Sequence, residues 1–149
     1  MATKTTWILV ADGARARIFK RQGAGGALLL APEDNFVHEV ERTHDMGSER
    51  PGRVVESSGG AHHAIAPRAD WNRQGKQQFA ERLAKHLDAA AERKEFDRLI
   101  LVAPPRVLGD LRASLGRHAR EHLAGELDKD LTALGTAEIG ERLAQAELG

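Results

Sequence analysis

The N-terminal part of the chain combines apolar runs and turn residues in an order that predicts three short strands. Trp7–Ala11 is an apolar run of strand length, and the Asp12-Gly13 dipeptide after it is typical of hairpin turns. Polar and apolar residues alternate over 14–19, as in a strand with one buried face. A glycine-rich turn at 22–26 leads to residues 27–30, which predict a third strand of the same antiparallel meander.

A helical pattern dominates the middle of the chain. Phe79, Leu83 and Leu87 recur one helical turn apart, with alanines beside them, and form one apolar face. They predict a helix over 71–93, and Asp70 is placed to act as its N-cap.

The remaining C-terminal elements follow from shorter patterns. The apolar run in 97–103 barely alternates, which predicts an interior strand. Pro104-Pro105 then opens a second helix, whose apolar side consists of Leu108, Leu111 and Leu115. Residues 117–131 fit either a strand or a helix, and 136–148 predict a short terminal helix.

The segment between the meander and the long helix is polar. Residues 31–56 are weakly patterned, with a short strand predicted at 53–56, and 57–70 are expected to form an exposed loop. Strands followed by helix, strand and helix predict an α/β fold with a mixed β-sheet, an N-terminal antiparallel meander and packed helices. The length of 149 residues favours a single domain over 1–149.

Charge is balanced overall but not locally. The chain has 22 Lys and Arg against 22 Asp and Glu, which excludes a global electrostatic attraction to nucleic acid. Between residues 50 and 76, however, five basic positions (50, 53, 68, 73 and 76) face two acidic ones (56 and 70). This local excess predicts a site for an anionic partner.

Other composition features limit the function classes. The chain has no cysteine, which excludes disulfides and thiolate chemistry. The first apolar run is too short for a secretory signal or a transmembrane helix, so we expect a cytoplasmic protein without a membrane partner.

The glycine pair before the long helix is the candidate for catalysis. Paired glycines let a partner approach the main chain, and the adjacent histidines change charge near neutral pH. The candidate catalytic residues are Gly59, Gly60, Ala61, His62 and His63.

Basic side chains around this segment are the candidates for binding. These residues are Arg53, Arg68, Arg73, Lys76 and Arg106. Arg106 falls in the first turn after the interior strand, where an arginine and free N–H groups can hold a phosphate or carboxylate. The alternative is a surface arginine paired with Asp110 one turn further along the helix.

A five-residue pattern near the C-terminus invites a metal hypothesis. Residues 118–122 match the H-x-x-E-H pattern of inverted zinc peptidases, with His118 and His122 as ligands and Glu121 as base. No downstream glutamate with its own motif follows, so a solvated surface of mixed charge is favoured. We expect neither a metal nor a cofactor.

Two further features favour structural roles over chemical ones. Ser57 and Ser58 lie near the histidines, but no strained turn motif surrounds them, so we expect them to cap or solvate the turn. Asp12 could present a carboxylate at a strand end, but closing the hairpin is its favoured role.

Three stretches resemble one bacterial family. The resemblance is to the "protein required for attachment to host cells" family, and it is carried by Trp7–Phe19, Phe96–Leu115 and Glu126–Thr132 (E-L-D-K-D-L-T). That family is similar to the central domain of eukaryotic and archaeal class I release factors, in which a Gly-Gly-Gln loop precedes a long helix. The resemblance implies a ribonuclease-H-like α/β fold. It does not assign a role to Lys129-Asp130, where a mixed-charge strand edge is the structural alternative.

The chain departs from the release factors at the catalytic glutamine. Ala61 stands at this position after Gly59-Gly60. Backbone N–H groups can still stabilise developing oxygen charge, but alanine cannot supply the side-chain contribution.

We therefore hypothesise a binding module for tRNA, ribosomal RNA or the ribosome, with weak or no peptidyl-tRNA ester hydrolysis. One alternative is a protein–protein interaction module that acts indirectly in attachment to host cells. The other is a peptidyl-tRNA or ester hydrolase.

Overall fold

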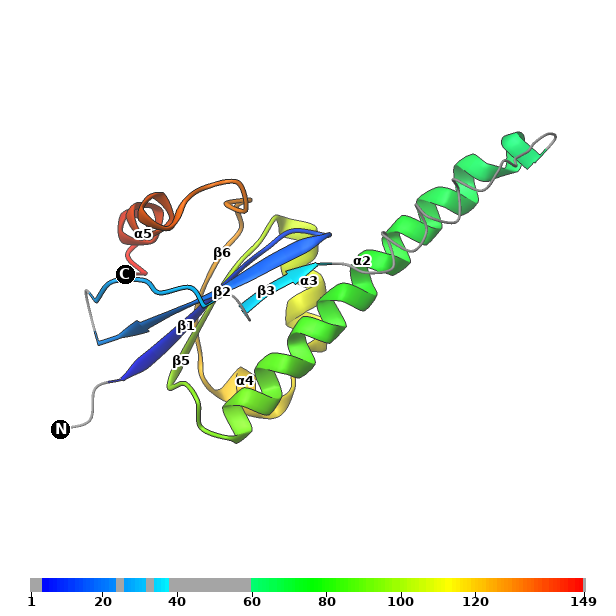
Figure 1. Cartoon of the computed structure of the whole chain (residues 1–149). Coiled ribbons are helices and arrows are strands. Elements are labelled where there is room, and N and C mark those ends of the chain that lie inside the picture. Colours follow the sequence, from blue (N-terminus) through cyan, green and yellow to red (C-terminus); the bar gives the residue numbers. More distant parts are fainter. Residues whose placement is uncertain (1–3, 24–25, 32–33, 38–59, 149) are drawn as a thin grey trace.

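In the computed structural model, the backbone is described for residues 4–23, 26–31, 34–37 and 60–148, and side chains over the same ranges except 60–72. The described strands form a five-stranded sheet with the order β3-β2-β1-β5-β6 (Figure 1). They are β1 (Thr5–Ala11), β2 (Arg15–Gln22), β3 (Asn35–Val37), β5 (Arg98–Val102) and β6 (Leu123–Leu127). β2 pairs antiparallel with β1 and β3, whereas β5 pairs parallel with β1 and β6. The mixed α/β sheet is confirmed, and its ribonuclease-H-like type remains a prediction.

Helices cover both faces of the sheet. α2 (Gly60–Glu92), α3 (Pro105–Ser114) and α4 (Arg117–Glu121) lie on one side, and α5 (Thr136–Gln145) lies on the other (Figure 1). Alternation along β1 explains the two layers. Trp7 and Leu9 pack in the cluster beneath α2, whereas Ile8 and Val10 pack in the cluster beneath α5.

Three predicted elements agree with the structure. β5 lies between β1 and β6, so the interior position predicted from its apolar run is confirmed. α3 begins at Pro105 as expected, and the leucines predicted for its apolar side are buried. α5 ends at Gln145, a few residues before the predicted limit. No helix in the part of the chain that the structure describes is long and apolar enough to span a membrane.

The strand predicted at 27–30 is wrong. Only Leu29 forms a bridge there, exchanging two backbone hydrogen bonds of 2.9 Å with Lys20. Leu28 and Leu30 instead pack against the cluster beneath α5, which explains an apolar run without a strand. The third strand of the antiparallel part is β3, inside the segment that lacks a clear pattern.

The exposed loop predicted at 57–70 is also wrong from residue 60 onward. α2 begins at Gly60, ten residues before the predicted N-cap, so Asp70 lies inside the helix. Four alanines between 61 and 69 favour this extension, since alanine has the highest helix propensity. The glycine pair and Pro67 are the features that favoured a loop. The strand predicted at 53–56 lies outside the described residues.

The ambiguous segment at 117–131 contains both kinds of element, α4 and then β6. Asp88 from α2 explains why a helix as short as α4 forms. Its Oδ1 accepts a hydrogen bond from the Ala119 backbone N–H at 2.9 Å, which caps the first turn. A Cβ on Gly116 would lie 2.5 Å from the Asp88 carboxyl carbon, so only glycine fits there without displacement.

We expect Gly116→Ala to lower the free energy of unfolding by about 1–3 kcal/mol, because the added methyl displaces the Asp88 cap. Gly109→Ala is the matched control. It lies within α3 with nothing within 4 Å of an added Cβ, so alanine should stabilise by about 0.5–1 kcal/mol through helix propensity. Urea denaturation of both variants measures the difference. Equal effects of the same sign would contradict the role given to Gly116.

Candidate functional site

Three parallel strands end at the same edge of the sheet. β1, β5 and β6 run in one direction, so the residues that follow them, including Asp12 and the segment 128–132, lie near one another. In α/β sheets, ligands bind preferentially outside the carboxyl ends of the strands. This carboxyl edge is therefore the candidate position for a functional site.

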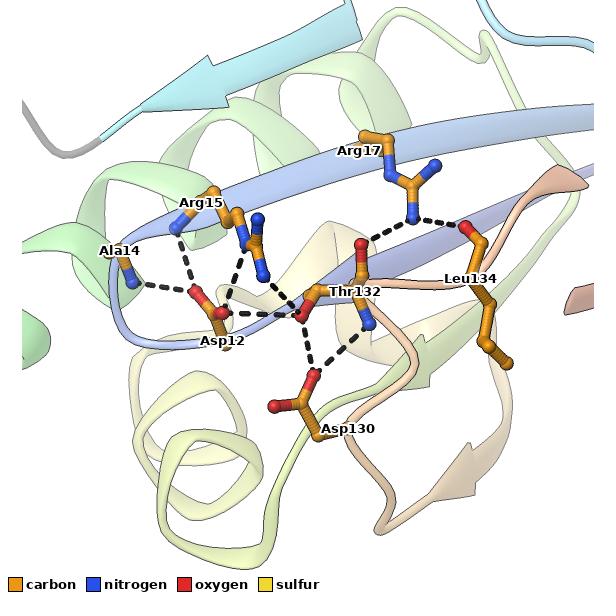
Figure 2. Close-up of polar contacts among 7 residues, drawn as sticks. All are labelled: Asp12, Ala14, Arg15, Arg17, Asp130, Thr132 and Leu134. Carbon is orange, nitrogen blue, oxygen red and sulfur yellow. Dashed lines mark hydrogen bonds and ion pairs between the residues drawn. The ribbon is translucent and has the colours of Figure 1, made fainter.

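Five polar residues meet at the carboxyl edge and form what we call the Thr132 hub (Figure 2). They are Asp12, Arg15, Arg17, Asp130 and Thr132. The Thr132 hydroxyl lies 3.2 Å from Asp12 Oδ2 and 2.5 Å from Asp130 Oδ1, and its single hydrogen can be donated to one of them at a time. It also lies within 3.5 Å of Arg15 Nη2, from which it accepts. Residues 120 positions apart are thus joined through one hydroxyl.

Asp12 closes the β1–β2 turn, as predicted. Its Oδ1 accepts the backbone N–H groups of Ala14 at 2.8 Å and Arg15 at 2.9 Å, and its Oδ2 accepts Arg15 Nε at 3.2 Å (Figure 2). Burial alone would raise the pKa of the Asp12 carboxyl. The hydrogen bonds from Ala14, Arg15 and Thr132 outweigh burial and hold this pKa below its ordinary value of 3.8.

The Thr132 hub is poorly suited to acid–base catalysis. Asp12 accepts three hydrogen bonds from Ala14 and Arg15 and shares the Thr132 hydroxyl hydrogen with Asp130, and a carboxylate with a lowered pKa is a weak general base. Within the described ranges, no three His, Cys, Asp or Glu side chains are grouped so that they could hold a metal ion. The arrangement fits binding and structural roles better than bond cleavage.

Arg17 attaches the C-terminal segment to β2. Its Nη2 donates to the carbonyl oxygens of Thr132 at 2.8 Å and Leu134 at 2.9 Å, and its guanidinium lies 5.2 Å from the centre of the Phe19 ring. Burial, and then the charge of Arg15, lower the pKa of Arg17. Further along β2, Arg21 Nη2 reaches the Leu148 carbonyl at 3.4 Å. Two arginines of one strand thus hold the chain on both sides of α5.

The predicted basic residues do not form one cluster. Arg73 pairs with Asp110 at 2.6 Å, so Asp110 is not the partner of Arg106 that the helical spacing suggested. Arg106 is exposed in the first turn of α3. Lys76 is exposed on α2, and its side-chain carbons lie where a Cβ on Gly13 would be. Arg53 lies outside the described residues, and Arg68 is placed only by the backbone of α2.

The candidate catalytic residues lie at the beginning of a helix. Gly60, Ala61, His62 and His63 form the first turn of α2, whereas Gly59 lies outside the described residues. Backbone N–H groups of a first turn have no partner within the helix. Ser57 and Ser58, considered as a nucleophile pair, also lie outside the described residues.

The two histidines of the H-x-x-E-H pattern have different partners. His118 Nδ1 lies 3.5 Å from Asp88 Oδ2 on α2, whereas His122 Nδ1 lies 3.0 Å from the Asp97 carbonyl oxygen. His122 follows the end of α4, so the helical spacing required for a shared metal is not formed.

The sequence signals for Arg15, Arg17 and Thr132 were weak. The alternation of β2 predicted that its arginines share a face, and the E-L-D-K-D-L-T stretch contained Thr132. Neither pattern indicated that these two segments would touch.

We expect Asp12→Asn to lower the free energy of unfolding at neutral pH by about 1 kcal/mol. The amide oxygen can still accept the turn N–H groups, but the ion pair with Arg15 is lost. Because the folded pKa of Asp12 is lowered, its charge contributes stability above about 3.8, and this contribution disappears as pH falls through the folded pKa.

Urea denaturation over a pH series measures this effect. The gap between wild type and Asp12→Asn should close in acid, and Asp128→Asn, at an exposed position after β6, is the control. A gap that stays constant down to the lowest pH at which the protein is folded would contradict the assignment.

Comparison with known proteins relates the whole described fold to one family. A family model described as "Protein required for attachment to host cells" matches residues 7–143, which include most of β1, the Thr132 hub and most of α5. A search of curated proteins gives no significant match. Because the matched region covers most of its length, the chain belongs to the family of proteins required for attachment to host cells.

Proposed function

We propose that this host attachment family protein binds RNA or a ribosomal complex through exposed cations beside the carboxyl edge, without hydrolysing an ester. The observation that carries the proposal is the pair Lys76 and Arg106. Both are exposed, and neither has an acidic partner among the described residues. Lys76 lies against the β1–β2 turn, and Arg106 follows β5, so they flank the same edge.

The length of α2 supports an extended partner. Its 33 residues span about 50 Å, and its N-terminal part extends beyond the sheet (Figure 1). The backbone position of Arg68 on this part continues the basic positions away from Lys76. A polyanion with regularly spaced phosphates suits such a surface better than a compact ligand does. Arg73 contributes less, since Asp110 neutralises it.

Two residues support weak or no ester hydrolysis. Ala61 offers no side-chain group to orient water, and Asp12 already accepts three hydrogen bonds from Ala14 and Arg15. We therefore favour binding over catalysis.

We expect the double variant Lys76→Ala, Arg106→Ala to bind tRNA more weakly and with a salt slope smaller by about 1–2, because phosphate contacts release counterions. Fluorescence anisotropy across a salt series measures both quantities. Lys85→Ala, Arg142→Ala removes the same charge at exposed positions on α2 and α5 and should leave binding unchanged. Equal affinities of the two double variants would contradict the proposal, and peptide release from labelled peptidyl-tRNA would show that the protein hydrolyses esters.

A second candidate function is a protein–protein role in attachment to host cells. The family description is the observation that favours it. Affinity purification of the tagged protein from its native cells separates the two candidates. Recovery of envelope or polysaccharide-synthesis proteins, with no ribosomal components, would favour this role over RNA binding.

A further inference from the structure

A groove of about 330 Å³ lies between β2, β3 and the segment that contains Thr132. Its lining includes Arg15, Arg17 and Thr132, and its exposed apolar side chain is Val37. The β2–β3 register places Arg15 opposite Val37, which is 52% exposed. The groove thus combines cations with apolar surface in a volume at the lower end of small-molecule sites.

The charged side chains that line the groove are basic. Arg15 and Arg17 are the charged side chains that line the groove, and no described acidic side chain lines it. Asp12 pairs with Arg15 from the turn, but both hydrogen-bond acceptors of Arg17 are neutral carbonyl groups. Arg17 therefore has no ion-pair partner among the described residues.

Two hydrogen bonds fix the Arg17 side chain, and its other N–H donors can bind a ligand. Both of its hydrogen bonds leave from Nη2, and the other terminal nitrogen points away from those carbonyls (Figure 2). A guanidinium has five N–H donors, so Nε and Nη1 retain the capacity to bind an oxyanion. The bonds to the Thr132 and Leu134 carbonyls fix the side chain before a ligand arrives, which lowers the entropic cost of binding.

We propose that this groove binds a small organic oxyanion, with Arg17 and Arg15 contacting its carboxylate or phosphate and the exposed Val37 side chain contacting its apolar body. Burial, and then the charge of Arg15, lower the pKa of Arg17, and a bound anion would offset the repulsion between the two guanidinium groups. The site does not depend on the proposed RNA binding, because Lys76 and Arg106 are not part of its lining.

Titration of isotope-labelled protein with benzoate, phenyl phosphate and inorganic phosphate tests this proposal by NMR, at an ionic strength held constant with sodium chloride. We expect saturable shifts in the Arg17 side-chain N–H and in backbone amides of β2 and β3. Stronger binding of phenyl phosphate than of benzoate would identify a phosphate ester as the ligand class, and the reverse order a carboxylate. Equal binding of phenyl and inorganic phosphate would refute the apolar contact, and no saturable shift with any probe would overturn the proposal.

Two substitutions define the site without breaking the Arg17 contacts. Arg15→Gln should weaken binding about tenfold, whereas Arg112→Gln, at an exposed arginine paired with Glu126, should leave it unchanged. Val37→Glu places a carboxylate opposite Arg15 and should weaken binding at least about threefold relative to Val37→Gln. The same spectra report whether each variant is folded. Equal affinity of the two Val37 variants would refute the assignment of the groove.

Discussion

Burial of β1 on both faces and both edges is the constraint on which the rest of the structure depends. Every residue from Thr6 to Ala11 is buried, with β2 along one edge and β5 along the other. Alternate side chains therefore have to be covered from opposite sides, by α2 on one and by α5 on the other. The parallel pairing with β5 also fixes the carboxyl edge, where the ends of the parallel strands meet. The Thr132 hub and the cations beside it follow from that arrangement.

The C-terminal segment is attached by a mixture of apolar packing and charge. Ile139 and Leu143 of α5 are fully buried against the sheet, and Arg17 and Arg21 of β2 donate to carbonyl groups before and after the helix. Carbonyl acceptors satisfy the hydrogen-bonding needs of an arginine but not its charge. Arg17 thus attaches the C-terminal segment without an ion-pair partner among the described residues.

Local patterns predicted the elements whose burial depends on their own residues. The alternation along β2 predicts one buried face, and the continuous apolar run of β5 predicts a strand buried on both faces. Both strands are present in the structure. The start of α2 was misplaced because Gly60 and Pro67 outweighed the alanines between them, although these alanines favour a helix. β3 was missed because three residues with one partly buried side chain leave no periodic signal.

Local sequence patterns did not predict the candidate site, because its residues are far apart in the sequence. Asp12 was identified as a turn residue, but its contact with Thr132 spans 120 positions and exists only because parallel strands end together. The ion pair of Asp110 likewise depends on how α2 crosses α3. Its observed partner is Arg73 of α2, whereas the spacing within α3 suggested Arg106. Helical spacing within α3 contains no information about that crossing. The similarity to release factors stays a hypothesis, whereas membership of the host attachment family is established by the match over 7–143.

The attachment of the C-terminal segment has a consequence for which positions of this chain tolerate substitution. Arg17 and Arg21 donate to main-chain oxygens, which every amino acid carries, so the contacts at Leu134 and Leu148 place no requirement on side-chain identity there. The requirement rests on the two positions of β2 alone. Substitution at the acceptor positions is then limited by apolar packing, whereas replacement of either arginine on β2 removes a contact that holds the segment.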